Sequence, residues 1–343
     1  MEKGKKSGDK LLIITQIADS ESRFGFFIGW IKEFAKYYKQ VHVLCLQKGT
    51  YNLPKNVKVY SMGKEMGYSK IKQIVNFYKL ILNLDYNKTF IHMNPIWVLL
   101  GFLVWKIKRI EINLWYALKH TPFNLRVANL FVKNLFTSTK ESVSIKTPKL
   151  RTVGQGIDLE NLKISRKPSG KIFKIISASR VSPVKDFLTA INALSLIDFD
   201  YEFDIYGEAI TKKDKDYLAE LSSILEKKNM SKKIKFKGLI SHKDLLKLLK
   251  NYDLFVNQSR TNSLDKAVLE AMACNMKVLT SNTAFKPVLS EDYKFEHGDF
   301  KTMAKKMKNL KETKTKPNFR GIVEKKHSTE NLIKKIVHYI QNG

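Results

Sequence analysis

Two kinds of apolar stretch alternate along this chain of 343 residues, and that alternation limits the folds it can adopt. Short β-branched runs such as LLIITQI (11–17) and VHVLCLQ (41–47) are typical of buried strands. Between such runs lie longer segments whose apolar residues recur at helical spacing, as in KIKQIVNFYKLILNL (70–84). This strand–helix–strand order predicts an α/β protein with parallel sheets covered by helices on both faces.

The alternation is interrupted between Thr152 and Lys171, where three glycines and a proline fall in a stretch without clear periodicity. We therefore predict two domains, an N-terminal one over residues 1–158 and a C-terminal one over residues 159–327. The final segment, 328–343, is amphipathic, and we expect it to pack back on the N-terminal domain.

The chain carries 62 Lys and Arg against 32 Asp and Glu, a formal net charge of +30. One interpretation is attraction to phosphates, an acidic membrane surface or nucleic acid. The other is a lysine-rich genome that scatters lysines over solvated faces. Arginine is scarce and no clustered basic stripe with aromatics is evident, so we expect no specific nucleic-acid partner.

Two cysteines, Cys45 and Cys274, are too few for a disulfide framework or a metal cluster and suit a reducing cytoplasm. The longest apolar stretch, 96–105, is shorter than the ~20 residues that span a bilayer. FFIGWIKEFAKYYK (26–39) and IWVLLGFLVWKIKR (96–109) combine apolar residues with lysines. We expect a cytoplasmic protein, and these two segments make it a candidate for peripheral binding to the inner face of the membrane. Buried helices with snorkelling lysines would explain the same two segments.

A first candidate site follows the strand-like KIFKIISA (171–178). Arg180 and Lys185 lie on either side of a short loop, and a helix begins near Asp186. Free N–H groups and two cations beside a helix start favour a diphosphate. Two ordinary surface cations would explain the same residues.

A second candidate site lies in NSLDKAVLEAMAC (262–274). Asn262 is predicted to cap a helix, with Asp265 three residues later. Glu270 lies beside the apolar stripe of that helix and is placed to accept the two hydroxyls of a ribose. An ordinary capped helix with a solvated glutamate remains the alternative.

These two sites, with YGEA (206–209), DLFVNQS (253–259) and the linker VGQGID (153–158), occur in an order that resembles glycosyltransferase family 4. The resemblance implies the GT-B fold, with two Rossmann-like α/β domains facing each other across a cleft. It extends over about 151–282 and reaches the N-terminal domain only in outline.

The resemblance implies a retaining hexosyltransferase that uses a UDP- or GDP-sugar, without a resident cofactor or metal. Arg180 and Lys185 would hold the diphosphate, and Asp265 and Lys266 would lie near the sugar. Substrate-binding positions would be Glu270, Asn262, Gly207 and Gly25. The acceptor would be a glycan or a lipid-linked glycan bound by the N-terminal domain.

Many members of the family carry a histidine that faces the donor sugar from the end of a strand in the N-terminal domain. His120, after INLWYAL (112–118), is the first candidate for a catalytic histidine here, and His92 in FIHMNP is the second. A structural role remains the alternative for both residues.

One departure from the family pattern is Asn262, which stands where the family often has a glutamate. It keeps open a catalytically degenerate relative that binds a partner. An epimerase- or phosphorylase-like enzyme of the same fold is a further alternative.

Overall fold

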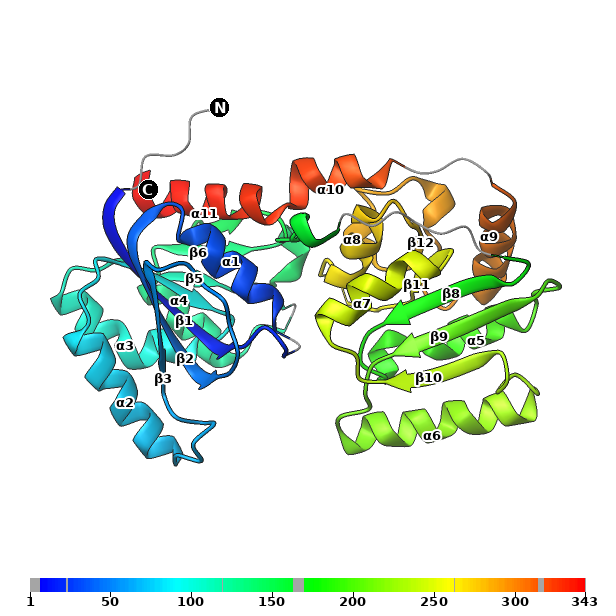
Figure 1. Cartoon of the computed structure of the whole chain (residues 1–343), viewed down its shortest axis with the longest axis horizontal. Helices are drawn as coiled ribbons and strands as arrows, with labels where there is room; N and C mark the ends of the chain where they lie inside the picture. Colours follow the sequence, from blue (N-terminus) through cyan, green and yellow to red (C-terminus); the bar gives the residue numbers. More distant parts are fainter. Residues whose placement is uncertain are drawn as a thin grey trace. The chain divides into compact units, whose positions relative to one another are not determined.

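The computed structural model describes residues 7–22, 24–118, 120–162, 170–261, 263–313 and 318–342. The chain forms two compact units, which we call unit 1 (Met1–Asp158 with Ser328–Gly343) and unit 2 (Leu159–His327). Each unit contains one sheet of parallel strands covered by helices (Figure 1). The α/β class predicted from the alternation is confirmed.

The sheet of unit 1 has the strand order β3-β2-β1-β4-β5-β6-β7, and every neighbouring pair is parallel. The order runs outward in both directions from β1 and β4, as in a Rossmann sheet. Its strands are β1 (Ser7–Ala18), β2 (Tyr38–Lys48), β3 (Val57–Ser61), β4 (Lys88–His92), β5 (Asn113–Trp115), β6 (Asn134–Thr137) and β7 (Leu150–Thr152).

Helices cover both faces of this sheet, which explains why its central strand is a continuous apolar run. Leu11 and Ile13 of β1 share a core with α1 (Phe26–Phe34) and α11 (Thr329–Asn342). Leu12 and Ile14 point to the other core. That second core is closed by three helices, α2 (Lys70–Asn83), α3 (Ile96–Ile107) and α4 (Phe123–Phe131).

For 26–39 the structure supports the alternative of a buried helix. Phe27, Trp30 and Phe34 of α1 are almost fully buried, and the helix packs against α11. Its apolar residues therefore belong to the core of unit 1. Within the part of the chain that the structure describes, no helix combines the length and apolar character needed to cross a bilayer.

The sheet of unit 2 has the order β10-β9-β8-β11-β12, again all parallel. The order reverses between β8 and β11, its topological switch point. The strands are β8 (Phe173–Ala178), β9 (Tyr201–Tyr206), β10 (Ile234–Gly238), β11 (Leu254–Asn257) and β12 (Lys277–Thr280).

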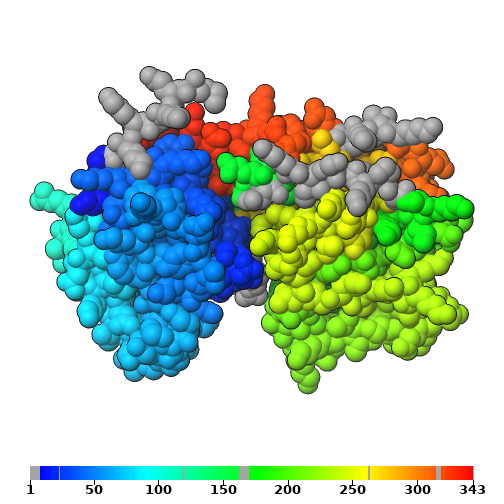
Figure 2. Space-filling view, viewed as in Figure 1, coloured from blue at the N-terminus to red at the C-terminus, as the bar shows by residue number. Residues whose placement is uncertain are grey.

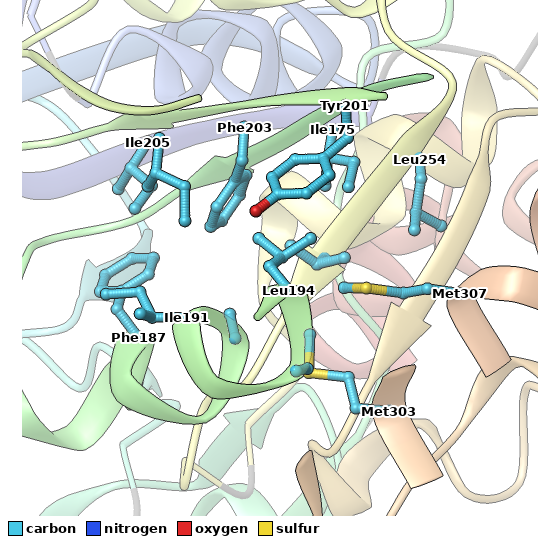
Figure 3. Close-up of a cluster of buried hydrophobic side chains, with 14 of the residues drawn as sticks. Ile175, Phe187, Ile191, Leu194, Tyr201, Phe203, Ile205, Leu254, Met303 and Met307 are labelled. Carbon is cyan, nitrogen blue, oxygen red and sulfur yellow. The ribbon is translucent and has the colours of Figure 1, made fainter. Parts of the chain in front are cut away.

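Three helices of unit 2, α5 (Phe187–Leu194), α6 (Lys212–Lys227) and α9 (Phe300–Glu312), share one apolar core with the sheet. Figure 3 shows part of this core, where Phe187 and Ile191 of α5 face Phe203 and Ile205 of β9. Figure 1 shows α7 (His242–Leu248) and α8 (Lys266–Ala273) on the opposite face of the sheet, and α10 (Phe319–His327) contacts α8.

Several helices begin where a short polar side chain caps the first turn. Thr211 and Asp214 form a reciprocal capping box at α6, because each side chain accepts a hydrogen bond from the other residue's backbone N–H. Ser69 caps α2 and Ser241 caps α7, because each side chain accepts a hydrogen bond from a backbone N–H in the first turn of its helix. Single 3-10 turns occur at Lys140–Ser142, Glu160–Leu162, Pro183–Lys185, Leu249–Asn251, Thr283–Phe285 and Glu291–Tyr293.

Candidate functional site

The carboxyl ends of β8 and β11 lie side by side, since these strands are neighbours at the switch point of unit 2. Ligands of open α/β sheets bind outside the carboxyl ends of the strands at such a point. The two loops that begin there are 179–186 and 258–265, and they contain most of the candidate residues. The backbone N–H of Arg260 donates to the carbonyl of Val184 at 2.9 Å, which joins the loops directly.

Lys185 and Asp265 form an ion pair between these loops. The Nζ atom of Lys185 lies 3.1 Å from Oδ1 and 3.2 Å from Oδ2 of Asp265, and it donates to Ser259 Oγ at 3.0 Å. The two side chains are only 12% and 20% exposed. The structure thus brings together a cation and a carboxylate that lie far apart in sequence.

Polar residues at two strand ends hold the carboxylate of Asp265 in place. Asn257, the last residue of β11, donates to Asp265 Oδ2 at 3.0 Å, and Asn282 donates to the same oxygen at 3.4 Å. Thr280, the last residue of β12, donates to Asn257 Oδ1 at 2.9 Å. Asp265 is therefore the centre of a network that fixes the ends of β11 and β12 relative to Lys185.

Arg180 follows β8 and is exposed, so its guanidinium can reach a ligand from solvent. Gly207, after β9, has φ +142°, and a Cβ atom there would lie 1.9 Å from the carbonyl oxygen of Ser179. Only glycine tolerates that conformation and that approach. Gly207 accordingly shapes the loop that carries Arg180.

Asp186 precedes α5 in the left-handed region, with φ 47°. Its carboxylate accepts a hydrogen bond from Thr189 Oγ1 at 2.8 Å and lies 3.2 Å from His297 Nε2. Arg260 Nη2 lies 3.6 Å away. These contacts stabilise an unusual backbone conformation immediately after Lys185.

The second candidate helix begins later than its sequence pattern predicts. Asp265 is the N-cap of α8, and its side chain makes no capping hydrogen bond because it bonds instead to Lys185 and the two asparagines. The prediction that Asn262 caps this helix is therefore wrong. Asn262 itself lies outside the described residues, so its substrate-binding role stays a prediction.

Glu270 of α8 is buried and bonded to the first residue of α7. His242 Nε2 lies 2.7 Å from Glu270 Oε1, and the glutamate side chain is 6% exposed. This burial excludes the alternative of an ordinary helix with a solvated glutamate. A carboxylate held by one imidazole is oriented for further hydrogen bonds at the edge of the sheet.

Lys266, the first residue of α8, also has a buried Nζ atom. Burial lowers the pKa of Lys266 well below its usual range, and the charge of Glu270 acts in the opposite direction. Lys266 and Glu270 are four residues apart on one helix, so both belong to the same face of the site.

His92, the last residue of β4, lies at the switch point of unit 1. It is buried, stacks on Phe27 with ring centroids 4.2 Å apart, and its Nδ1 lies 3.4 Å from Thr15 Oγ1. These contacts describe a histidine packed in an aromatic cluster.

His120 and Gly25 have different surroundings in unit 1. β5 ends at Trp115, so His120 lies in the following loop rather than at a strand end, and it is exposed. Tyr116 Oη donates to its carbonyl oxygen at 2.9 Å. Gly25 precedes α1, and a Cβ atom there would lie 2.3 Å from the carbonyl oxygen of Ser20.

Sequence reasoning missed four residues that build the site, namely Asn257, Ser259, Asn282 and His242. Asn257 ends the buried strand β11, and Ser259 and Asn282 lie two residues beyond the ends of β11 and β12. Polar residues at the carboxyl ends of buried strands are a signal that could have found these three. His242 had no comparable signal, because its partner Glu270 is 28 residues away. Among the described residues, no group of three or more His, Cys, Asp and Glu side chains could hold a metal ion.

Comparison with solved structures identifies the fold. HepE from Anabaena, in complex with UDP and glucose, superposes with a TM-score of 0.78 over 98% of this chain and 100% of its own, at 18% identity. TarM from S. aureus, in complex with fondaparinux, alpha-GlcNAc-glycerol and UDP, has a TM-score of 0.62 at 16% identity, over 79% of this chain and 59% of its own. The two Rossmann-like units of this chain therefore have the GT-B fold.

Sequence comparison finds a family match that falls almost entirely within unit 2. Residues 159–318 match the family described as "Glycosyl transferases group 1". A probable sucrose-phosphate synthase from Thermosipho melanesiensis is 24% identical over 219 residues, 61% of this chain. The chain spans about half the length of that relative, 49%. Residues 159–318 are thus similar to the group 1 glycosyltransferases, in agreement with the resemblance that the sequence indicates.

Proposed function

We propose that the protein is a retaining hexosyltransferase that moves a sugar from a nucleotide-diphosphate sugar to a glycan or a lipid-linked acceptor, without a metal ion. The observation that carries this proposal is the position of Lys185. Its ammonium lies at the switch point of unit 2, between two loops that start at neighbouring strand ends. Positive charge preorganised there suits a diphosphate leaving group.

In this proposal the candidate residues of unit 2 bind different parts of the nucleotide-sugar donor. Arg180 and Lys185 bind the diphosphate and stabilise the negative charge that grows on it. Glu270 accepts hydrogen bonds from the ribose hydroxyls, with His242 holding its other side. Asp265 and Lys266 act on the sugar.

The transfer step needs one bond broken and one formed. The bond between the sugar's anomeric carbon and the phosphate oxygen breaks, and its electron pair leaves with the diphosphate. The acceptor hydroxyl oxygen bonds to the same carbon on the same face, and its proton passes to the departing phosphate oxygen. Loss of one preorganised donor such as Arg180 or Lys185 should slow this step by ~10²–10³.

For unit 1 we propose the acceptor site and the catalytic histidine. His120 is the better candidate for that histidine, since it is exposed, whereas His92 is buried against Phe27. Gly25 keeps its proposed substrate-binding role, although the close approach that requires a glycine there is that of the Ser20 carbonyl oxygen.

UDP is the first nucleotide to test, because HepE and TarM were solved with it. Calorimetry with UDP, GDP, ADP and CMP should give binding of one diphosphate, weakened at least tenfold in Arg180→Ala and in Glu270→Ala. Lys227→Ala, on the far end of α6, is the matched control and should bind as the wild type does. Release of nucleotide from the matching sugar donor then measures turnover.

The alternative is a catalytically degenerate relative that binds a partner. It is favoured by the engagement of Lys185 with Asp265 and of Glu270 with His242, which leaves fewer groups for a donor. Absence of binding to all four nucleotides would support this second function and contradict the first.

A further inference from the structure

The three helices that close one face of the unit 1 sheet expose an unusual set of apolar side chains. More than half of each of these side chains is accessible, and the value for Ile107 is 81%. We call six of these residues the apolar set: Ile71 and Val75 of α2, Leu103 and Ile107 of α3, and Phe123 and Leu130 of α4. Leu82, near the end of α2, is also 53% exposed. Single exposed apolar residues are ordinary, but a set on adjacent helices is not.

The three helices form one continuous layer. Tyr78 of α2 donates to the carbonyl of Leu100 in α3 at 2.8 Å. Phe102 of α3 stacks on Phe131 of α4, with ring centroids 4.3 Å apart. In each helix the members of the set are four or seven residues apart, so they share a face. Figure 1 shows the helices side by side, and the light-blue surface of α2 is open at the lower edge of unit 1 in Figure 2.

The charges on this layer have one sign. Every residue of α2, α3 and α4 is described, and none of them is Asp or Glu. The charged residues of the three helices are all cationic and exposed: Lys70, Lys72, Lys79, Lys106 and Arg126. The carboxylates that follow α2 and α3 are paired, Asp85 with Lys10 and Glu111 with Lys133.

We propose that the outer face of α2, α3 and α4 docks on an anionic lipid bilayer. Apolar side chains flanked by cations fit the boundary between acyl chains and acidic headgroups. A second copy of the same face is a poorer partner, because it would bring two sets of uncompensated cations together. This inference deepens the proposed function, because a lipid-linked acceptor lies at such a surface, and the surface involves none of the donor-site residues.

Co-sedimentation with vesicles tests the proposal with the full chain. The wild type should sediment with vesicles of phosphatidylcholine containing about one third phosphatidylglycerol, and this binding should weaken as salt screens the charges. The triple variant Ile71→Ser, Ile107→Ser, Phe123→Ser should bind at least tenfold more weakly. So should the charge variant Lys79→Glu, Lys106→Glu, Arg126→Glu.

Three exposed apolar residues of unit 2 give the matched control. The variant Ile172→Ser, Leu196→Ser, Leu239→Ser should sediment as the wild type does. UDP binding is measured in every variant, so that loss of the donor site is distinguished from loss of the docking surface. Equal binding to pure phosphatidylcholine, or undiminished binding by both layer variants, would overturn the proposal. So would concentration-dependent dimers that the triple variant abolishes in a protein that ignores the vesicles.

Discussion

The ammonium of Lys185 donates to both carboxylate oxygens of Asp265, at 3.1 and 3.2 Å. Lys185 lies near the end of the loop after β8, and Asp265 ends the loop after β11. The pair therefore fixes the two loops at the switch point and also neutralises a cation that the proposed function assigns to the diphosphate. Lys185 cannot be fully paired with Asp265 and fully available to the diphosphate at the same time. Substitutions at this ion pair therefore test the proposed function most directly.

Replacing Asp265 with Asn removes the negative charge but keeps the shape of the side chain. Because Lys185 is then no longer neutralised, we expect UDP to bind more tightly. Transfer should nevertheless slow by ~10² or more if Asp265 acts on the sugar. Calorimetry and turnover measure the two effects separately. Asp198→Asn, which breaks the exposed pair with Lys308, is the control. Unchanged affinity together with unchanged turnover would refute both roles.

Gly207→Ala should destabilise unit 2. The new Cβ atom would lie 1.9 Å from the Ser179 carbonyl oxygen, at a φ that alanine rarely adopts. We expect the free energy of unfolding to fall by about 2 kcal/mol or more. Gly170→Ala, where nothing lies within 4 Å, should change it little. Chemical denaturation checks both variants, and equal stabilities would show that the loop relaxes freely.

His242→Ala should weaken nucleotide binding through Glu270. Loss of the 2.7 Å contact leaves a buried carboxylate less well oriented, and we expect UDP affinity to fall by about tenfold. The same substitution in a Glu270→Ala background should have little further effect, because the two residues act as one unit. A UDP analogue that lacks both ribose hydroxyls should be insensitive to His242→Ala. If the losses of UDP affinity in the two single variants instead added up in the double variant, His242 and Glu270 would act independently.

We expect Lys266 to make the free energy of unfolding depend on pH, in a direction that its pKa shift fixes. Its folded pKa is lowered, so between that pKa and its unfolded value near 10.5 the unfolded chain binds the additional proton. The contribution of Lys266 to the free energy of unfolding therefore rises with pH between these two pKa values. Lys266→Met should remove this slope, which is at most about 1.4 kcal/mol per pH unit.

Urea unfolding at about pH 7 and about pH 9.5 checks this prediction. Lys227→Met, at an exposed position on α6, serves as the control. Parallel slopes for the wild type and Lys266→Met would show that Lys266 keeps an ordinary pKa.

The α/β alternation could be predicted because each buried strand is locally apolar on both faces, as Leu11 to Ile14 are. The edge strands β3 and β7 were not predicted. Both are short, and their residues are partly exposed, so neither gives a strong period-2 signal.

The candidate site was only partly predictable. Arg180, Lys185 and Glu270 occur in recognisable local patterns, but the contact between Lys185 and Asp265 joins residues 80 positions apart. No local sequence pattern predicts a contact between residues so far apart in the chain. The true start of α8 was missed for the same reason, since the side chain of Asp265 is directed to Lys185 by tertiary contacts rather than to its own helix.

The last helix, α11, buries Leu332, Ile336 and Ile340 in the core that contains β1. Unit 1 is thus assembled from segments on both sides of unit 2 in the sequence. The ribosome therefore makes the sequence of unit 2 between the strands of unit 1 and the helix that completes one of their cores. Helix α1 can pack on those strands early, but this core is completed only after the sequence of unit 2 has been made.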